Sequence, residues 1–239
     1  MNYAPTAPYR PLGWRTTAAC VAIGGTIVAH LLSDVASFAT LGASEEDLGA
    51  ALAQLAGGVG LLGASILAAV IFLVWFHRAA VNVRAFGATG LQFTPGWCVG
   101  WWFVPLASLW KPLAAVKEVW RASEPDGVGQ PYGWTYARTP GIMNLWWTTY
   151  VVGNILGNLS GRIEDRQASA VLGVCCTVAN AVCAACVIPI IRGLARRQEE
   201  CGERLARAWQ APAAPPGYSG PPGYDARPGA LDNPYAPPR

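Results

Sequence analysis

The stretch that decides the fold runs from Gly49 to Phe76 and reads GAALAQLAGGVGLLGASILAAVIFLVWF. It contains 28 residues and no Asp, Glu, Lys or Arg. About 20 apolar residues are enough for a helix to cross ~30 Å of hydrocarbon. A helix also pairs its own backbone N–H and C=O groups, for which lipid offers no partners. The stretch therefore predicts a membrane-spanning helix.

Three further stretches also lack Asp, Glu, Lys and Arg: Thr16 to Ser33, Thr139 to Gly161 and Gln167 to Ile191. Charged residues make up only 13% of the whole chain, whereas a soluble domain has about 25%. We therefore expect an all-α polytopic membrane protein with four transmembrane helices, over about 16–40, 49–76, 139–161 and 167–191. The first could instead be a cleaved signal peptide, since Ser37 and Ala39 follow it, but no clean A-x-A site is present.

The distribution of basic residues predicts the orientation. With four spans, 15 of the 17 Lys and Arg residues lie on the same side as both termini, and only Arg162 and Arg166 lie on the other side. The first loop on that other side carries Glu45, Glu46 and Asp47. Because cytoplasmic loops are enriched in Lys and Arg, we expect both termini in the cytoplasm.

A segment rich in Trp and Pro lies between the two pairs of spans. Trp97 to Trp110 is apolar but has only 14 residues, and Pro105 interrupts it. This is too short for a full span, so residues 95–122 are predicted to be re-entrant or interfacial. In its second half, Leu113, Val116, Val119 and Trp120 share a helical face opposite Glu118 and Arg121, as in an amphipathic interfacial helix.

The same region supplies the candidate lipid or ligand site. Trp rings favour the headgroup level, and neighbouring Arg side chains can meet anionic headgroups. We favour an interfacial anchor; the alternative is a hairpin around Pro105 that forms a lipid-headgroup or small-molecule site with Arg78 and Asn82. The candidate residues are Trp75, Arg78, Asn82, Pro95, Trp97, Gly100, Trp101, Trp102, Pro105, Trp110, Pro112, Trp120 and Arg121.

Four sequence elements carry a family resemblance. They are FLVWFHR at 72–78 with Asn82 downstream, FTPGW at 93–97, GWWFVP at 100–105 and WRAS at 120–123. From about Pro11 to Arg197 the chain resembles the bacterial membrane family called domain of unknown function 4328 (DUF 4328). His77 stands where that family commonly has Tyr. The resemblance implies a multi-pass protein of the bacterial plasma (inner) membrane, and it implies no activity.

A stripe of small residues marks the third predicted span. Gly153, Gly157 and Gly161 are spaced four apart, with Asn154 and Asn158 beside them. This pattern is typical of closely packed membrane helices, and Asn180 is a candidate hydrogen-bond partner on the fourth span. Helix packing is the favoured interpretation, and a polar permeation path is the alternative.

The terminal regions differ in composition from the spans. Residues 1–15 and 209–239 are predicted to be disordered, and 198–208 a charged, solvated helical stalk. The C-terminal tail repeats Pro-Pro-Gly-Tyr at 215–218 and 221–224. We favour a flexible tether, although such a polyproline segment could also bind a cytoplasmic protein.

No catalytic, cofactor-binding or metal-binding constellation is evident. Cys183 and Cys186 have metal-like spacing, but they lie in an apolar span and are expected to pack. No basic run with interleaved aromatics suggests nucleic acid. We expect a non-enzymatic scaffold or regulatory membrane component without cofactors, in contact with membrane lipids and compatible with homo-oligomers. The alternatives are a small transporter or channel, a lipid-headgroup-binding protein and, with least support, a lipid enzyme.

Overall fold

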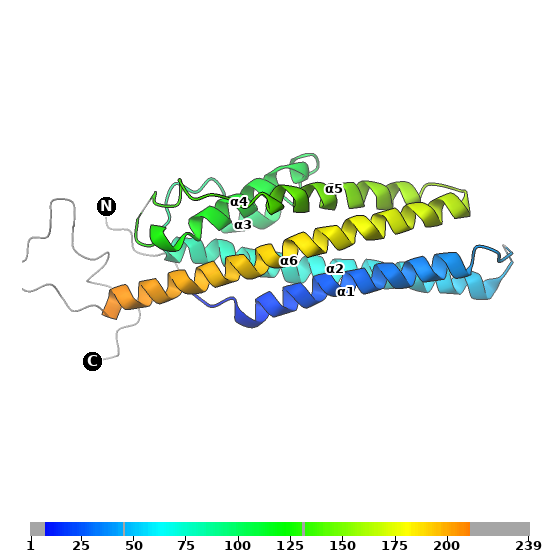
Figure 1. Cartoon of the computed structure of the whole chain (residues 1–239), viewed down its shortest axis with the longest axis horizontal. Helices are drawn as coiled ribbons and strands as arrows, with labels where there is room; N and C mark the ends of the chain where they lie inside the picture. The colour runs from blue at the N-terminus through cyan, green and yellow to red at the C-terminus, as the bar shows by residue number, and fades with distance from the viewer. Residues whose placement is uncertain (1–7, 45, 131, 211–239) are drawn as a thin grey trace, which may run out of the picture.

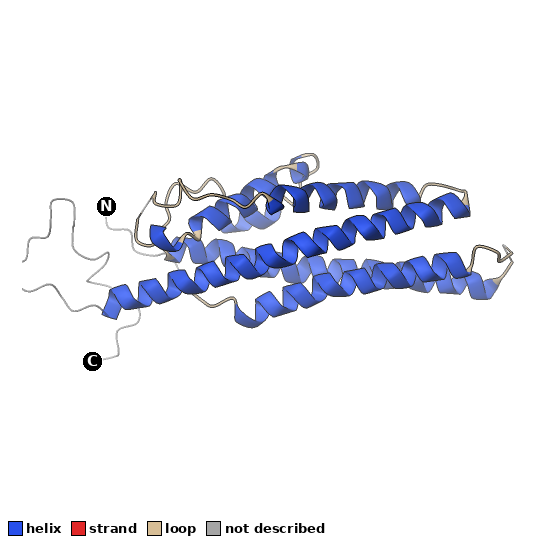
Figure 2. Ribbon diagram, in the orientation of Figure 1, coloured by secondary structure: helices blue, strands red, loops and turns tan. Residues whose placement is uncertain are grey.

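The structure is a computed structural model that describes residues 8–44, 46–130 and 132–210. Its described part is all-helical and contains no strand (Figure 2). The helices are α1 (Gly13–Ala39), α2 (Leu48–Ala85), α3 (Pro95–Gly100), α4 (Lys111–Ala122), α5 (Ile142–Ser160) and α6 (Arg166–Gln210), with short 3-10 turns η1 (Ala107–Leu109) and η2 (Pro125–Gly127).

Two antiparallel helix pairs form the long axis of the molecule (Figure 1). α1 packs along α2, α5 packs along α6, and α6 also packs along α1. We call the end where α1 and α5 begin and α2 ends the basal end, and the opposite end the distal end. Short loops join each pair distally, while α3 and α4 lie at the basal end (Figure 1).

Three helices, α1, α2 and α6, are long and apolar enough to cross a membrane. α5, which covers most of the predicted span 139–161, has 19 residues and is not among them. It carries Asn154 and Asn158, which lower its apolar character. The predicted all-helical architecture is therefore confirmed for the described residues, with three candidate membrane spans where four were predicted.

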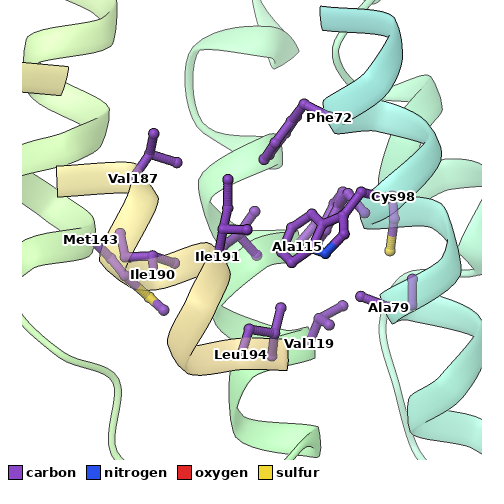
Figure 3. Packing of buried hydrophobic residues seen from close by; sticks show 14 of the residues in the cluster. Phe72, Ala79, Cys98, Ala115, Val119, Met143, Val187, Ile190, Ile191 and Leu194 are labelled. Atoms are coloured by element: carbon purple, nitrogen blue, oxygen red, sulfur yellow. The ribbon is translucent and has the colours of Figure 1, made fainter. Parts of the chain in front are cut away.

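The core lies in the basal half of the bundle. Phe72 and Ala79 of α2, Val119 of α4, Met143 of α5 and Leu194 of α6 belong to one buried cluster (Figure 3). This burial explains why α2 and α6 continue beyond the predicted ends of the spans at 76 and 191. The additional helical turns bury apolar residues between the helices, so neither helix ends at the first Arg after its apolar stretch.

Part of the predicted tails belongs to the folded structure. Leu12 is buried, and the ring centroid of Tyr9 lies 5.4 Å from that of Phe86. In the predicted stalk, Gln198 and Cys201 are fully buried rather than solvated, because α6 packs there against the basal core. The predicted disorder of residues 1–7 and 211–239, with the Pro-Pro-Gly-Tyr repeats, lies outside the described residues.

Candidate functional site

The Trp- and Pro-rich segment folds as a hairpin of α3 and α4. Thr94 begins α3 by accepting a 3.3 Å hydrogen bond from Trp97 N, with Pro95 at the first turn. The chain reverses at a γ-turn, where Ala107 N donates to Pro105 O at 2.7 Å and Leu106 has φ 63° and ψ −54°. These residues define the hairpin tip, residues 103–110.

The tip combines exposed and packed apolar side chains. Phe103 and Leu106 are 72% and 73% exposed, and Trp110 is also exposed. On the inner side, the Trp102 ring contacts Phe72 with 5.5 Å between centroids. Trp147 Nε1 of α5 donates a 2.7 Å hydrogen bond to Leu109 O. The tip is thus held against α5 and leaves an apolar surface outside the core.

The other tryptophans predicted to lie at the headgroup level, here called the belt tryptophans, are mostly internal. Trp75 is buried and donates from Nε1 to Thr16 Oγ1 at 3.1 Å. Lys111 Nζ lies 5.5 Å from the centroid of Trp101, and the Arg197 guanidinium lies 4.9 Å from that of Trp120. Among the predicted belt tryptophans, Trp97 and Trp110 are the exposed ones. Basal tryptophans therefore act mainly as packing residues.

The smaller candidates in this segment have local structural roles. A Cβ added to Gly100 would lie 3.1 Å from the ring of Trp97, so the close ring contact favours glycine here. Pro112 is buried at the start of α4, and Arg121 is half-buried near its end.

The side chains of Asn82 and Arg78 form hydrogen bonds with the N-terminal segment, residues 8–16, rather than with the hairpin tip. Asn82 is fully buried; its Nδ2 donates to Arg10 O and to Gln198 Oε1, both at 2.9 Å, and its Oδ1 accepts from Arg10 N. Arg78 donates to Pro8 O at 3.4 Å. The hairpin site predicted around these two residues is therefore not assembled.

A cavity of about 670 Å³ lies between the two helix pairs. It extends from Gly58 to Leu73 on α2, roughly 22 Å along the helix at ~1.5 Å per residue. Facing α2 are Tyr150 to Asn158 on α5 and Cys176 to Val187 on α6. Most of its lining is apolar, as expected for a site that takes a hydrophobic molecule.

Three asparagines contribute to the polar part of the lining. Nδ2 of Asn154 donates to Tyr150 O, that of Asn158 to Asn154 O and that of Asn180 to Cys176 O, at 2.8 to 2.9 Å. One N–H of each amide is thus engaged by its own helix, and the Oδ1 atoms can act as acceptors. Among the hydrogen bonds of the described residues, none runs from the side chain of one of these asparagines to the side chain of another.

The basal end of the cavity has an aromatic floor. The Phe72 ring lies 6.5 Å from Trp146 and 5.5 Å from Trp102, centroid to centroid. At the other end, His30 of α1 joins Asn158 in the lining. The cavity is therefore apolar and aromatic basally and more polar toward the distal end.

The predicted packing glycines contribute to one wall of the cavity. A Cβ on Gly153 would lie 3.0 Å from Asn180 Nδ2, and one on Gly157 would lie 3.4 Å from Cys176 Sγ. These glycines allow α5 to approach α6 closely. Gly161 differs, because it caps the C-terminus of α5 and a Cβ added there would meet only Gly157 O of the same helix, at 3.8 Å.

Two buried polar residues escaped the sequence interpretation. Glu118, predicted to face solvent, is buried and accepts hydrogen bonds from Gln92 N at 2.7 Å and Phe93 N at 3.1 Å. Gln198 donates from Nε2 to Ala79 O and to Ser123 Oγ, both at 3.0 Å. A polar residue inside a charged stretch gives no signal of burial, so neither could be identified from its spacing.

Ion pairs and burial shape the electrostatics of the basal end. Arg197 pairs with Glu124, and Arg204 with Asp126 at 2.6 Å. Burial raises the pKa of the Cys201 thiol to about 12. Burial, together with the nearby Glu199, Cys201 and Glu203, raises the pKa of Tyr9 to about 12. The described residues contain no group of three His, Cys, Asp or Glu side chains that could hold a metal ion.

Comparison with known proteins gives one match. The family model described as "Domain of unknown function (DUF4328)" matches residues 38–196, about two thirds of the chain. No curated protein and no solved structure matches.

Proposed function

The chain belongs to the DUF4328 family, and we propose that it is a non-enzymatic membrane protein that binds an amphipathic, lipid-like molecule between its two helix pairs. The observation that carries this proposal is the cavity of about 670 Å³, with its aromatic floor and its asparagine acceptors. Apolar walls with a few placed polar groups are the usual chemistry of a small-molecule site.

The proposed setting is a bacterial plasma membrane with four crossings and both termini in the cytoplasm. α5 would be the fourth crossing, since it packs along α6, one of the three helices long and apolar enough to span. The basal end would be cytoplasmic, because it holds Arg78, Arg84 and Lys111. The hairpin tip, with Phe103 and Leu106 exposed, would insert into the cytoplasmic leaflet.

The geometry supports entry from the bilayer. α2 and α5 do not pack closely on each other, although each packs on its own partner helix. Asn154 and Asn158 line the cavity and are exposed. A polar amide facing hydrocarbon is costly, so a bound group that donates a hydrogen bond would stabilise this face.

Binding is better supported than permeation or catalysis. The rings of Phe72, Trp102 and Trp146 close the basal end, so a continuous polar path is not favoured. Cys176, a potential nucleophile in the lining, donates to Gly153 O at 3.3 Å. The scaffold role of the C-terminal tail remains a prediction from the sequence and is compatible with ligand binding in the membrane.

Retention of lipid by the purified full-length protein tests this proposal. Ala69 lines the cavity, whereas the adjacent Val70 is exposed and does not line it. Native mass spectrometry in mild detergent should detect a lipid-sized adduct on the wild type and on Val70→Trp. Ala69→Trp, which adds the same ring inside the cavity, should lower the occupancy at least tenfold. Equal occupancy in all three proteins would refute the proposal.

A second pair of variants tests the polar part of the site. Asn154→Leu combined with Asn158→Leu removes two acceptors and preserves approximate side-chain size. A net hydrogen bond contributes about 1 kcal/mol, so the bound adduct should weaken by roughly fivefold or more. Leu145→Ala, at an exposed position outside the lining, should leave the adduct unchanged.

A further inference from the structure

The N-terminal segment lies along the basal part of α2. Trp75 Nε1 donates to Thr16 Oγ1 at 3.1 Å, and Arg78 donates to Pro8 O at 3.4 Å. One turn further along α2, Asn82 bonds to both the N–H and the C=O of Arg10. The segment is therefore fixed in register with α2, a relationship that no sequence pattern indicates.

This register places two further guanidinium groups within electrostatic range of that of Arg78. Arg10 and Arg15 are close enough to Arg78 for their charges to act on it. Within the described residues, the ion pairs of the basal end involve Arg197, Arg204 and Arg207, and none involves these three. Arg78 Nε is buried and has no hydrogen-bond acceptor among the residues that the structure describes. The cluster thus carries positive charge that no ion pair among the described residues compensates.

The cluster lies beside residues suited to a membrane interface. Trp14 is 71% exposed, and the Arg15 guanidinium lies 5.0 Å from the centroid of its ring. Exposed Trp favours the headgroup level of a bilayer. Two other basal cations differ: Arg84 donates to Ala80 O and Phe93 O, and Lys111 lies over two aromatic rings.

We infer that Arg10, Arg15 and Arg78 bind the phosphate of an anionic lipid headgroup at the basal end. A guanidinium group can form two parallel hydrogen bonds to phosphate oxygens, which suits a cluster without a carboxylate partner among the described residues. The site is separate from the cavity between the helix pairs, so it goes beyond the proposed function. A lipid is favoured over a soluble phosphate because Trp14 places the cluster at the headgroup level.

Binding of phosphatidylglycerol to the full-length protein tests this inference. The protein is held in phosphatidylcholine nanodiscs, and increasing fractions of spin-labelled phosphatidylglycerol quench its Trp fluorescence. At ~1 kcal/mol for each basic residue, Arg15→Gln and Arg78→Gln should each weaken the preference for phosphatidylglycerol about fivefold. Arg121→Gln, which removes a basal charge outside the cluster, should leave it unchanged, and Arg78→Lys should retain part of it.

Three outcomes would overturn the inference. The first is an equal loss for Arg121→Gln and Arg15→Gln, which would indicate diffuse attraction. The second is displacement of the lipid by millimolar glycerol phosphate, which would indicate a site for soluble anions. The third is an unchanged preference in an Arg78→Gln protein that keeps the thermal stability of the wild type.

Discussion

The side-chain amide of Asn82 on α2 donates a 2.9 Å hydrogen bond to Gln198 Oε1 on α6, and both side chains are fully buried. Gln198 extends this contact to Ala79 O and to Ser123 Oγ at the end of α4. One polar network therefore ties the N-terminal segment, α2, α4 and α6 together beneath the proposed membrane.

Asn82→Leu should destabilise the basal end strongly. It leaves the buried Gln198 Oε1 without a partner, which costs about 1–3 kcal/mol, and it also removes the hydrogen bonds to the backbone of Arg10, an exposed residue. We expect the apparent free energy of unfolding in detergent to fall by about 2–3 kcal/mol. The double variant with Gln198→Leu should lose less than the sum of the single variants, whereas additive losses would show that the two side chains are not coupled.

Glu118→Gln should loosen the hairpin. The carboxylate accepts backbone N–H groups from Gln92 and Phe93, and an amide can replace only one of its two acceptor oxygens. Hydrogen bonds to a charged group contribute about 1.5–3 kcal/mol, so a loss of that order is expected in thermal denaturation. Glu203→Gln, whose partner Arg207 is exposed, should change the stability by less than about 1 kcal/mol; similar losses for both would contradict the assignment.

Cys201 should react slowly with maleimide in the folded protein. The thiol lies in the basal extension of α6, is fully buried, and has a pKa raised by burial to about 12. This raised pKa contributes stability below pH 9, and the contribution is lost as the pH rises from 9 toward 12. At pH 8, labelling should be at least tenfold slower than in denaturant, and it should accelerate in Asn82→Leu. Fast labelling of the native protein would contradict the buried position.

The hairpin tip should lie in a hydrocarbon-like environment. In a background with Cys175→Ala, the variant Leu106→Cys is labelled with an environment-sensitive nitrobenzoxadiazole dye, which then lies at the γ-turn. In liposomes its emission should shift to the blue and be quenched by lipids brominated near the headgroup. Tyr136→Cys, at a 93% exposed loop position, should report water. Water-like emission from both positions would exclude insertion.

Much of the fold could be predicted because long apolar runs leave few alternatives in a membrane. The stretches around α1, α2 and α6 follow directly from length and the absence of charge. The extension of α2 to Ala85 could not be predicted in this way, since charged residues such as Arg78 and Arg84 are typical of the end of a spanning helix at the membrane interface. Their backbone stays helical because Ala79, Ala80 and Val83 between them are buried.

The site was less predictable because it depends on contacts between distant segments. Asn154 and Asn158 were identified, but their sequence spacing cannot distinguish a packed amide from one that lines a cavity. Glu118 was predicted to face solvent because an amphipathic pattern places charged residues on the exposed face of a helix. Arg10 was assigned to a disordered tail, and only its bonds to Asn82 place it beside Arg78.

Photocrosslinking tests the central claim, a lipid-like ligand between the helix pairs, most directly. The full-length protein is reconstituted with a phospholipid that carries a diazirine in its acyl chain, irradiated and digested for peptide mapping. We predict adducts on cavity residues such as Ser65 and Ala69 of α2 and Tyr150 and Gly153 of α5, reduced at least tenfold in Ala69→Trp and preserved in Val70→Trp. Adducts confined to outward-facing residues such as Val70 and Val74, with equal yields in both variants, would contradict the account.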